Sequence, residues 1–158
     1  MRLEVTYTNN IGERLHGLAA EFRAVRAQLL DQAGNQLEQA LDRSITASGL
    51  LDIHGKIRSW QEQYKGSGGG YVALRPTATD VNGQKVSGPN SPGAITNYLE
   101  SGHKVRFPSG RAKRYRPEVH MARARAFKFY ADTQPVAEEV AREMAQSVER
   151  RLAAYLEG

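Results

Sequence analysis

The sequence predicts an α+β fold: a small antiparallel sheet flanked by a long N-terminal helix and a C-terminal helix, with flexible loops. Apolar residues recur every three or four positions from Ile11 to Ile45 and again from Val136 to Tyr155, which is the spacing of one helix face. Between these stretches lie short strand-like runs separated by glycine-rich turns. We expect a single domain over residues 1–158, because that length is ordinary for one domain.

The N-terminal part predicts a short strand and then a long helix. Apolar and polar residues alternate over residues 3–7, the period of a half-buried strand. Asn10 and Glu13 have the spacing of a helix cap, and the helix is expected to run to about residue 47, or roughly 55 Å. Gly34-Asn35 is expected to kink or break it. Such a helix would either pack across a small sheet or project toward another chain.

The middle of the chain predicts a hairpin and two mobile loops. Residues 53–64 fit either a strand or a short helix, whereas residues 71–75 fit a strand. The glycine run at residues 66–70 is expected to be a flexible connector between them. Asn82-Gly83 favours a type I′ turn, inside a second mobile loop at about residues 80–93. Loops of this kind often become ordered against a partner.

Two further helices are indicated by their caps. Ser91 and Pro92 predict a helix start, and Gly102 is expected to end that helix in the left-handed conformation. Alternating Ala and Arg residues over 122–126 predict a strand. Thr133 or Gln134 is expected to cap the C-terminal helix, whose charges follow the helix dipole.

The composition argues against several classes of protein. The chain has no cysteine, which excludes disulfides, thiolate catalysis and Cys-ligated zinc. Since no apolar run approaches ~20 residues and the first residues lack the apolar centre of a signal peptide, we expect a soluble protein made in the cytoplasm, without membrane contact. The glycine run at 66–70 lacks the Lys-Ser/Thr of a phosphate-binding loop. No Gly-x-Ser-x-Gly elbow occurs.

The sequence gives only weak support for a metal site. Glu100, His103 and His120 are a conceivable ligand set, but Gly102 separates the first two, and the neighbouring cations oppose a divalent ion. Glu100 is expected instead to be a helix-end carboxylate that pairs with an arginine. We therefore predict no catalytic, cofactor or metal residues, and a protein that is not an enzyme.

Positive charge is concentrated in one segment, the basic strip, defined as residues 104–128. It holds nine Lys and Arg residues against one Glu, a net charge of +8, so the rest of the +5 chain sums to −3. The cations, interleaved with aromatic residues, are Lys104, Arg106, Arg111, Lys113, Arg114, Arg116, Arg123, Arg125 and Lys128. The strip fits non-specific duplex contact or charge pairing with an acidic neighbouring subunit, and the two are equally open.

Several short motifs together resemble a known family. Gly55, Ile57, Ser59 and Trp60 precede the predicted hairpin, Tyr98, Glu100 and Gly102 follow the loop, and Arg125-Ala126-Phe127 leads into the last helix. This order is similar to the tail-completion and head-to-tail joining (neck) proteins of long-tailed bacteriophages. The chain departs from the family pattern at Ile57, which replaces Leu at a shorter spacing, at His103, where Thr is usual, and at Ala126, where Pro is usual.

The resemblance implies a structural role. It implies a virion component, made in the host cytoplasm, that forms a homo-oligomeric ring, expected to be a hexamer, completing the tail. Its partners would be itself, the tail tube or terminator, the head connector and the genomic DNA in the lumen. The motif positions Gly55, Ser59, Trp60, Tyr98, Glu100, Gly102 and Phe127 are then structural, and the basic strip lies at subunit interfaces or faces DNA. The alternative is a non-specific nucleic-acid-binding protein that uses the basic strip.

Overall fold

The computed structural model describes residues 11–79, 82–104 and 123–157, and its architecture is the predicted α+β fold. The elements, in order, are α1 (Ile11–Ala47), α2 (Lys56–Ser59), β1 (Gln61–Lys65), the 3₁₀ turn η1 (Ser67–Gly69), β2 (Val72–Pro76), α3 (Pro92–Ser101), β3 (His103–Lys104), β4 (Arg123–Ala124) and α4 (Phe129–Glu157). The strands predicted at residues 3–7 and much of the basic strip lie outside the described residues.

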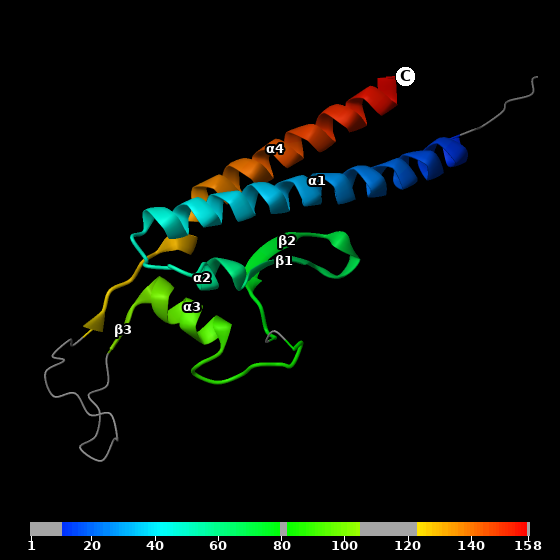
Figure 1. Ribbon diagram of the computed structural model, residues 1–158. Helices are drawn as coiled ribbons and strands as arrows, with labels where there is room; N and C mark the ends of the chain where they lie inside the picture. Colours follow the sequence, from blue (N-terminus) through cyan, green and yellow to red (C-terminus); the bar gives the residue numbers. More distant parts are fainter. Residues whose placement is uncertain (1–10, 80–81, 105–122, 158) are drawn as a thin grey trace, which may run out of the picture.

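Helices α1 and α4 run antiparallel along one side of the molecule (Figure 1). Their 37 and 29 residues make them the longest elements described, and at 1.5 Å per residue α1 extends for roughly 55 Å. The β1–β2 hairpin lies beneath the middle of α1 and α3 beneath its C-terminal part, so the N-terminal end of α1 and the C-terminal end of α4 project beyond them (Figure 1). Thus α1 both packs across the sheet and projects. In the described part of the chain, no helix combines the length and apolar character needed to span a bilayer.

Gly34 neither kinks nor breaks α1, contrary to expectation, because the helix is continuous from Ile11 to Ala47. The glycine instead marks the closest approach of the hairpin. A Cβ at this position would overlap the Gln63 side chain and lie 3.2 Å from Cγ2 of Val72. Gln63 Nε2 donates to Asn35 Oδ1 at 3.0 Å and to Glu38 Oε2 at 2.7 Å, so polar contacts hold the hairpin on the helix.

The predicted hairpin is confirmed. Strands β1 and β2 pair antiparallel, with Gln61 opposite Pro76 and Lys65 opposite Val72. The glycine run between them forms the η1 turn, whose Gly68 carbonyl accepts a hydrogen bond from Arg26 at 2.6 Å. The segment that fitted either a strand or a helix contains both, since α2 ends just before β1 begins.

The predicted type I′ turn at Asn82-Gly83 is described only in part, because residues 80 and 81 lie outside the described residues. Gly83 has the positive φ, 76°, that this turn type needs at its second central residue. An isolated bridge between Thr79 and Lys85 closes this turn.

Helix α3 begins as predicted, and Gly102 ends it in a different conformation from the one expected. The Ser91 side chain accepts from the Ala94 amide at 3.2 Å, with Pro92 in the first turn. Gly102 has φ 66° and ψ 165°, a region that is essentially restricted to glycine but is not the left-handed helical one. A Cβ there would lie 2.7 Å from the Ala124 carbonyl oxygen, so the glycine also permits β4 to approach.

The hydrophobic core lies where α1, α3 and the start of α4 meet. Leu41, Ile45 and Phe129 are almost fully buried at its centre. Half-buried apolar side chains from every neighbouring element pack around them: Leu50, Ile57, Leu74, Leu99, Phe127 and Tyr130. The core therefore fixes the end of α1 against the segment that leads into α4.

Helix α4 begins at Phe129, before the predicted caps Thr133 and Gln134, which lie inside it together with Pro135. The buried Thr133 hydroxyl donates to the Phe129 carbonyl at 2.7 Å instead of capping. The strand predicted over 122–126 is shorter than expected, because within the described residues only Arg123–Ala124 pairs with β3. The backbone from Arg125 to Lys128 turns along the end of α3, with Phe127 N donating to the Leu99 carbonyl at 2.8 Å.

Candidate assembly interface

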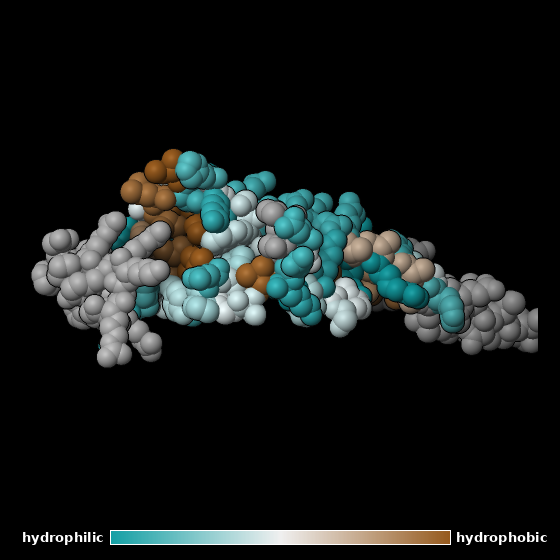
Figure 2. Space-filling model, turned by 60° about the horizontal axis from the view of Figure 1, so that its bottom comes forward, coloured by the Kyte–Doolittle hydropathy of each residue, from teal (hydrophilic) through white to brown (hydrophobic). Residues whose placement is uncertain are grey.

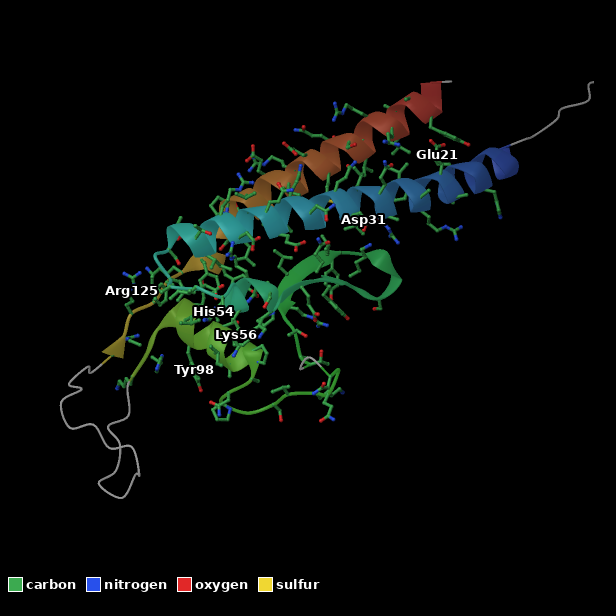
Figure 3. The ribbon with its side chains drawn as sticks, viewed as in Figure 1. Glu21, Asp31, His54, Lys56, Tyr98 and Arg125 are labelled. Carbon is green, nitrogen blue, oxygen red and sulfur yellow. The ribbon has the colours of Figure 1, made fainter. Side chains whose placement is uncertain are left out.

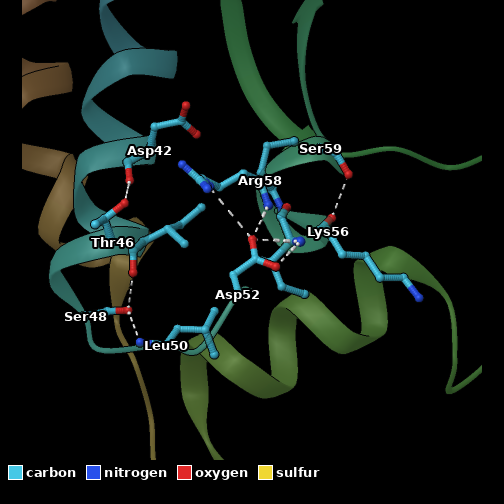
Figure 4. A network of polar contacts seen from close by, with 11 residues as sticks. Asp42, Thr46, Ser48, Leu50, Asp52, Lys56, Arg58 and Ser59 are labelled. Atoms are coloured by element: carbon cyan, nitrogen blue, oxygen red, sulfur yellow. Dashed lines mark hydrogen bonds and ion pairs between the residues drawn. The ribbon is translucent and has the colours of Figure 1, made fainter. Parts of the chain in front are cut away.

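The loop between α1 and α2, residues 48–55, is held in one conformation by a buried carboxylate. The Asp52 side chain is 8% exposed, and its oxygens accept from the Ile57 and Arg58 amides at 3.1 Å (Figure 4). These amides are at the start of α2, where free N–H groups need acceptors. The Gly55 amide also donates to the Asp52 carbonyl at 2.9 Å. Asp52 therefore closes the loop onto the helix that follows it.

The beginning of the same loop is fixed to the end of α1. The Ser48 hydroxyl donates to the Ile45 carbonyl at 2.7 Å and accepts from the Leu50 amide at 3.2 Å (Figure 4). From across the fold, Arg125 Nη2 donates to the Ser48 carbonyl at 2.8 Å. A cation at a helix C-terminus is favourable because the last carbonyls carry partial negative charge. Arg125, expected at a subunit interface or facing DNA, thus has a structural contact within the chain.

This ordered loop holds two large aliphatic side chains in solvent. Leu51 is 86% exposed and Ile53 is 82% exposed, whereas Leu50 between Ser48 and Leu51 packs on the core. Burying one such side chain stabilises a protein by about 1.5–3 kcal/mol, so leaving both in water forgoes a sizeable gain. We call Leu51 and Ile53 the apolar knob. Figure 2 shows hydrophobic residues gathered at the end of the molecule that carries β3 and β4.

Positive side chains lie at the same end. Lys104 and Arg123 are directly opposite each other in the β3–β4 pair, and both are exposed. Like charges in that position destabilise a strand pair, and an anionic partner would relieve the repulsion. Figure 3 places Lys56 and Arg125 at this end of the molecule too, together with His54 and Tyr98. An anionic surface that approached this end would therefore meet several cations.

The structure describes only part of the basic strip. Lys104, Arg123, Arg125 and Lys128 are placed, and all four are exposed. Lys128 is the residue immediately before α4, with φ 57°, and its amide lies 3.3 Å from the Glu100 carbonyl. The other predicted interface or DNA-facing residues, Arg106, Arg111, Lys113, Arg114 and Arg116, lie outside the described residues.

The motif residues of the α3 end and of the segment before α4 come together as one structural junction. Among the described residues Glu100 has no arginine partner, and it acts as a cap instead. Its two carboxylate oxygens accept from the Tyr130 and Ala131 amides, each at 3.0 Å, so Glu100 caps α4 from another helix. Phe127 and Gly102 form the close backbone contacts beside it. The exposed ring of Tyr98 lies 5.1 Å from that of His103, centroid to centroid.

The first motif has a local role. Gly55 has φ 62° and precedes α2, and the Ser59 amide returns to the Gly55 carbonyl at 2.8 Å. The Trp60 carbonyl accepts from Thr77 N at 2.7 Å, which extends the hairpin, and Lys56 Nζ lies 5.2 Å from the Trp60 ring centroid. These residues form the link between the knob loop and the sheet.

A buried polar network links the sheet to α4. The Tyr130 hydroxyl donates to Gln61 Oε1, and Gln61 Nε2 donates to the Ile57 carbonyl at 2.9 Å and to Thr96 Oγ1 at 3.4 Å. Burial, and secondly the charge of Glu100, raise the pKa of Tyr130 to about 12. The phenol therefore remains a hydrogen-bond donor well above neutral pH, which suits a structural role better than proton transfer.

Glu100 and His103, two of the three conceivable metal ligands, lie in the described residues. Both oxygens of Glu100 already accept helix amides. Across the described ranges, no group of three or more His, Cys, Asp or Glu is placed to hold a metal ion. His120 lies outside those ranges.

The apolar knob was not singled out from the sequence. The available signal was three aliphatic residues, Leu50, Leu51 and Ile53, directly after the Ser48-Gly49 helix end. Such a run predicts core residues, and only the tertiary structure shows that Leu50 alone of the three packs on the core.

Comparison with protein-family models gives no match, and neither the curated proteins nor the solved structures include one that matches the chain.

Proposed function

We propose that this chain is a structural subunit that assembles with copies of itself. The observation that carries the proposal is the ordered loop that holds Leu51 and Ile53 at 86% and 82% exposure. A loop held by Asp52, Ser48 and Arg125 loses little conformational freedom when it binds, so the apolar contact contributes its free energy to association. Side chains that become fully desolvated near the centre of an interface carry most of its binding free energy.

The more specific form of the proposal is a tail-completion or head-to-tail joining subunit of a long-tailed bacteriophage. The resemblance supports it, and its residues Glu100, Gly102 and Phe127 lie at one junction that orients α4 relative to α3. In this role the protein is a virion component and not an enzyme. It forms a ring, expected to be a hexamer, between the tail tube or terminator and the head connector, with DNA passing through the lumen.

The test is the absolute mass of the purified protein, measured by light scattering after size exclusion at several concentrations and two salt concentrations. Wild type is expected to form a discrete oligomer, visible as rings by negative-stain microscopy. The Leu51→Ser, Ile53→Ser double variant should shift to monomer while keeping its circular dichroism spectrum, because both residues are exposed in the single chain. A wild type that is monomeric at every concentration refutes self-assembly, and a discrete oligomer that forms no rings refutes the neck ring alone.

A second candidate, non-specific binding of duplex nucleic acid, is favoured by the paired cations Lys104 and Arg123. Phosphate contacts release counterions, so duplex affinity should fall steeply with salt. The quadruple variant Arg111→Ala, Lys113→Ala, Arg114→Ala, Arg116→Ala should abolish the binding, and Lys104→Ala should weaken it. Unchanged duplex affinity in the quadruple variant would show that the strip is not a DNA site.

A further inference from the structure

A groove lies between α1 and α4, on the face of the helix pair away from the hairpin. One part of it has a volume of about 450 Å³ and is lined by Ala40, Arg43, Ser44, Ala47, Asp132, Thr133, Val136 and Glu139. A second hollow of about 370 Å³ continues it along the helices, with Ala33, Val140 and Met144 among its lining residues. With 3.6 residues per turn, Ala40 is about 240° round α1 from Gly34, the point of closest approach of the hairpin.

The groove exists because small side chains on α1 face larger ones on α4. Ala33 and Ala40 are buried on the α4 side of α1. Because their side chains are small, the two helices can pack closely while a hollow remains at the surface. Val136 and Met144 on α4 remain half-buried, since no other described element covers this face of the pair. The base of the groove is therefore apolar and accessible, which suits an aliphatic anchor.

The charges at the groove and at the apolar knob are complementary. On α4, Asp132 and Glu139 line the groove as exposed carboxylates, and Arg43 is on the α1 side. The second hollow has one exposed carboxylate, Glu143, and one exposed cation, Arg150, both on α4. Next to the knob, Lys56 and Arg58 are exposed, whereas the Asp52 carboxylate is only 8% exposed. The apolar knob thus has the cations Lys56 and Arg58 beside it, and the part of the groove lined by Val136 has the carboxylates Asp132 and Glu139 on its α4 side.

We infer that the apolar knob of one copy docks into the α1–α4 groove of a second copy. This inference rests on the proposed function and names the contact that carries it. Knob and groove belong to one folded unit, in which Leu51 and Ile53 remain exposed, so the knob does not fill its own groove. Because the contact joins two different surfaces, it can repeat from copy to copy, and it closes into a ring when the rotation per step divides a full turn.

Introduced cysteines test the contact, because the natural chain has none. Ile53→Cys labels the knob and Val136→Cys labels the groove. Mixing the two single variants under mild oxidation should give a disulfide-linked dimer, whereas each variant alone should not, since a disulfide needs Cα atoms within about 7 Å. Ala24→Cys, on an exposed position of α1 outside the groove, is the matched control and should give no dimer with Ile53→Cys.

Each result has a separate meaning. An Ile53→Cys dimer formed without the groove variant would show knob-to-knob pairing and overturn the inference. A discrete oligomer in light scattering without any mixed cross-link would overturn the groove as the docking site while leaving self-assembly intact. A monomer by light scattering, with no cross-link, would refute the proposed function itself.

A pair of charge variants gives an independent readout. Glu139→Lys should weaken self-association by about tenfold or more, because it places a positive charge opposite Lys56 and Arg58, the cations beside the apolar knob. Glu138→Lys makes the same change at the preceding residue of α4, which is exposed but does not line the groove. Equal effects of the two variants would show that only net charge matters and would refute the specific contact.

Discussion

Replacing Glu100 tests whether one helix caps another in this fold. In Glu100→Ala the Tyr130 and Ala131 amides lose the acceptors that lie 3.0 Å from each of them. Loss of a helix cap costs about 1 kcal/mol, and loss of a negative charge at the helix N-terminus adds about 0.3–1 kcal/mol. We therefore expect the free energy of unfolding to fall by about 2 kcal/mol. Glu100→Gln keeps one acceptor oxygen but no charge, and should lose about half as much.

The measurement is urea denaturation followed by circular dichroism at fixed protein concentration, since association would otherwise shift the midpoint. In a chain of 158 residues the same loss should lower Tm by roughly 4–8 °C. Glu138→Ala removes an equal charge from an exposed site on α4 and should change stability by less than about 0.5 kcal/mol. If Glu100→Ala were no more destabilising than Glu138→Ala, the cap would contribute nothing and the reasoning would fail.

Three other substitutions test the pH dependence of stability at Tyr130, the backbone conformation at Gly102 and the loop cap formed by Asp52. Because the folded pKa of Tyr130, about 12, is above its ordinary value of about 10, its contribution to stability is complete below pH 10 and is lost as the pH rises through 12. Between pH 9 and 12 the free energy of unfolding, measured by urea denaturation, should therefore fall more steeply with pH for wild type than for Tyr130→Phe. The same pH dependence in both proteins would contradict the burial of the phenol. Gly102→Ala should cost roughly 3 kcal/mol in thermal unfolding, since its Cβ would lie 2.7 Å from the Ala124 carbonyl. Gly93→Ala, with nothing within 4 Å, is the control and should be neutral or stabilising. Asp52→Ala should cost about 1–2 kcal/mol and also weaken self-association, because the loop that presents the knob loses its cap; tight association in a destabilised Asp52→Ala would show that loop order is irrelevant to assembly.

Local sequence signals were sufficient for α1, for the start of α3 and for the hairpin. The period of apolar residues gave α1 its extent to Ala47, and Ser91 with Pro92 gave α3 its start. These features depend on residues close together in the chain, so they can be read without knowing the fold. The concentration of positive charge in residues 104–128 is likewise a property of the sequence alone.

Contacts between distant segments determined the start of α4, the role of Gly34 and the exposure of the apolar knob. Helix α4 begins at Phe129 because Glu100, about 30 positions earlier, accepts its first amides, and no residue near Phe129 signals that cap. Gly34 accommodates the approaching hairpin and not a kink, because helix packing outweighs the local propensity of one glycine. The composition of the α1–α2 loop showed that aliphatic residues were present, but not which of them would be exposed. Only the packed core, which takes Leu50 and leaves Leu51 and Ile53 in solvent, determines the surface from which assembly is proposed.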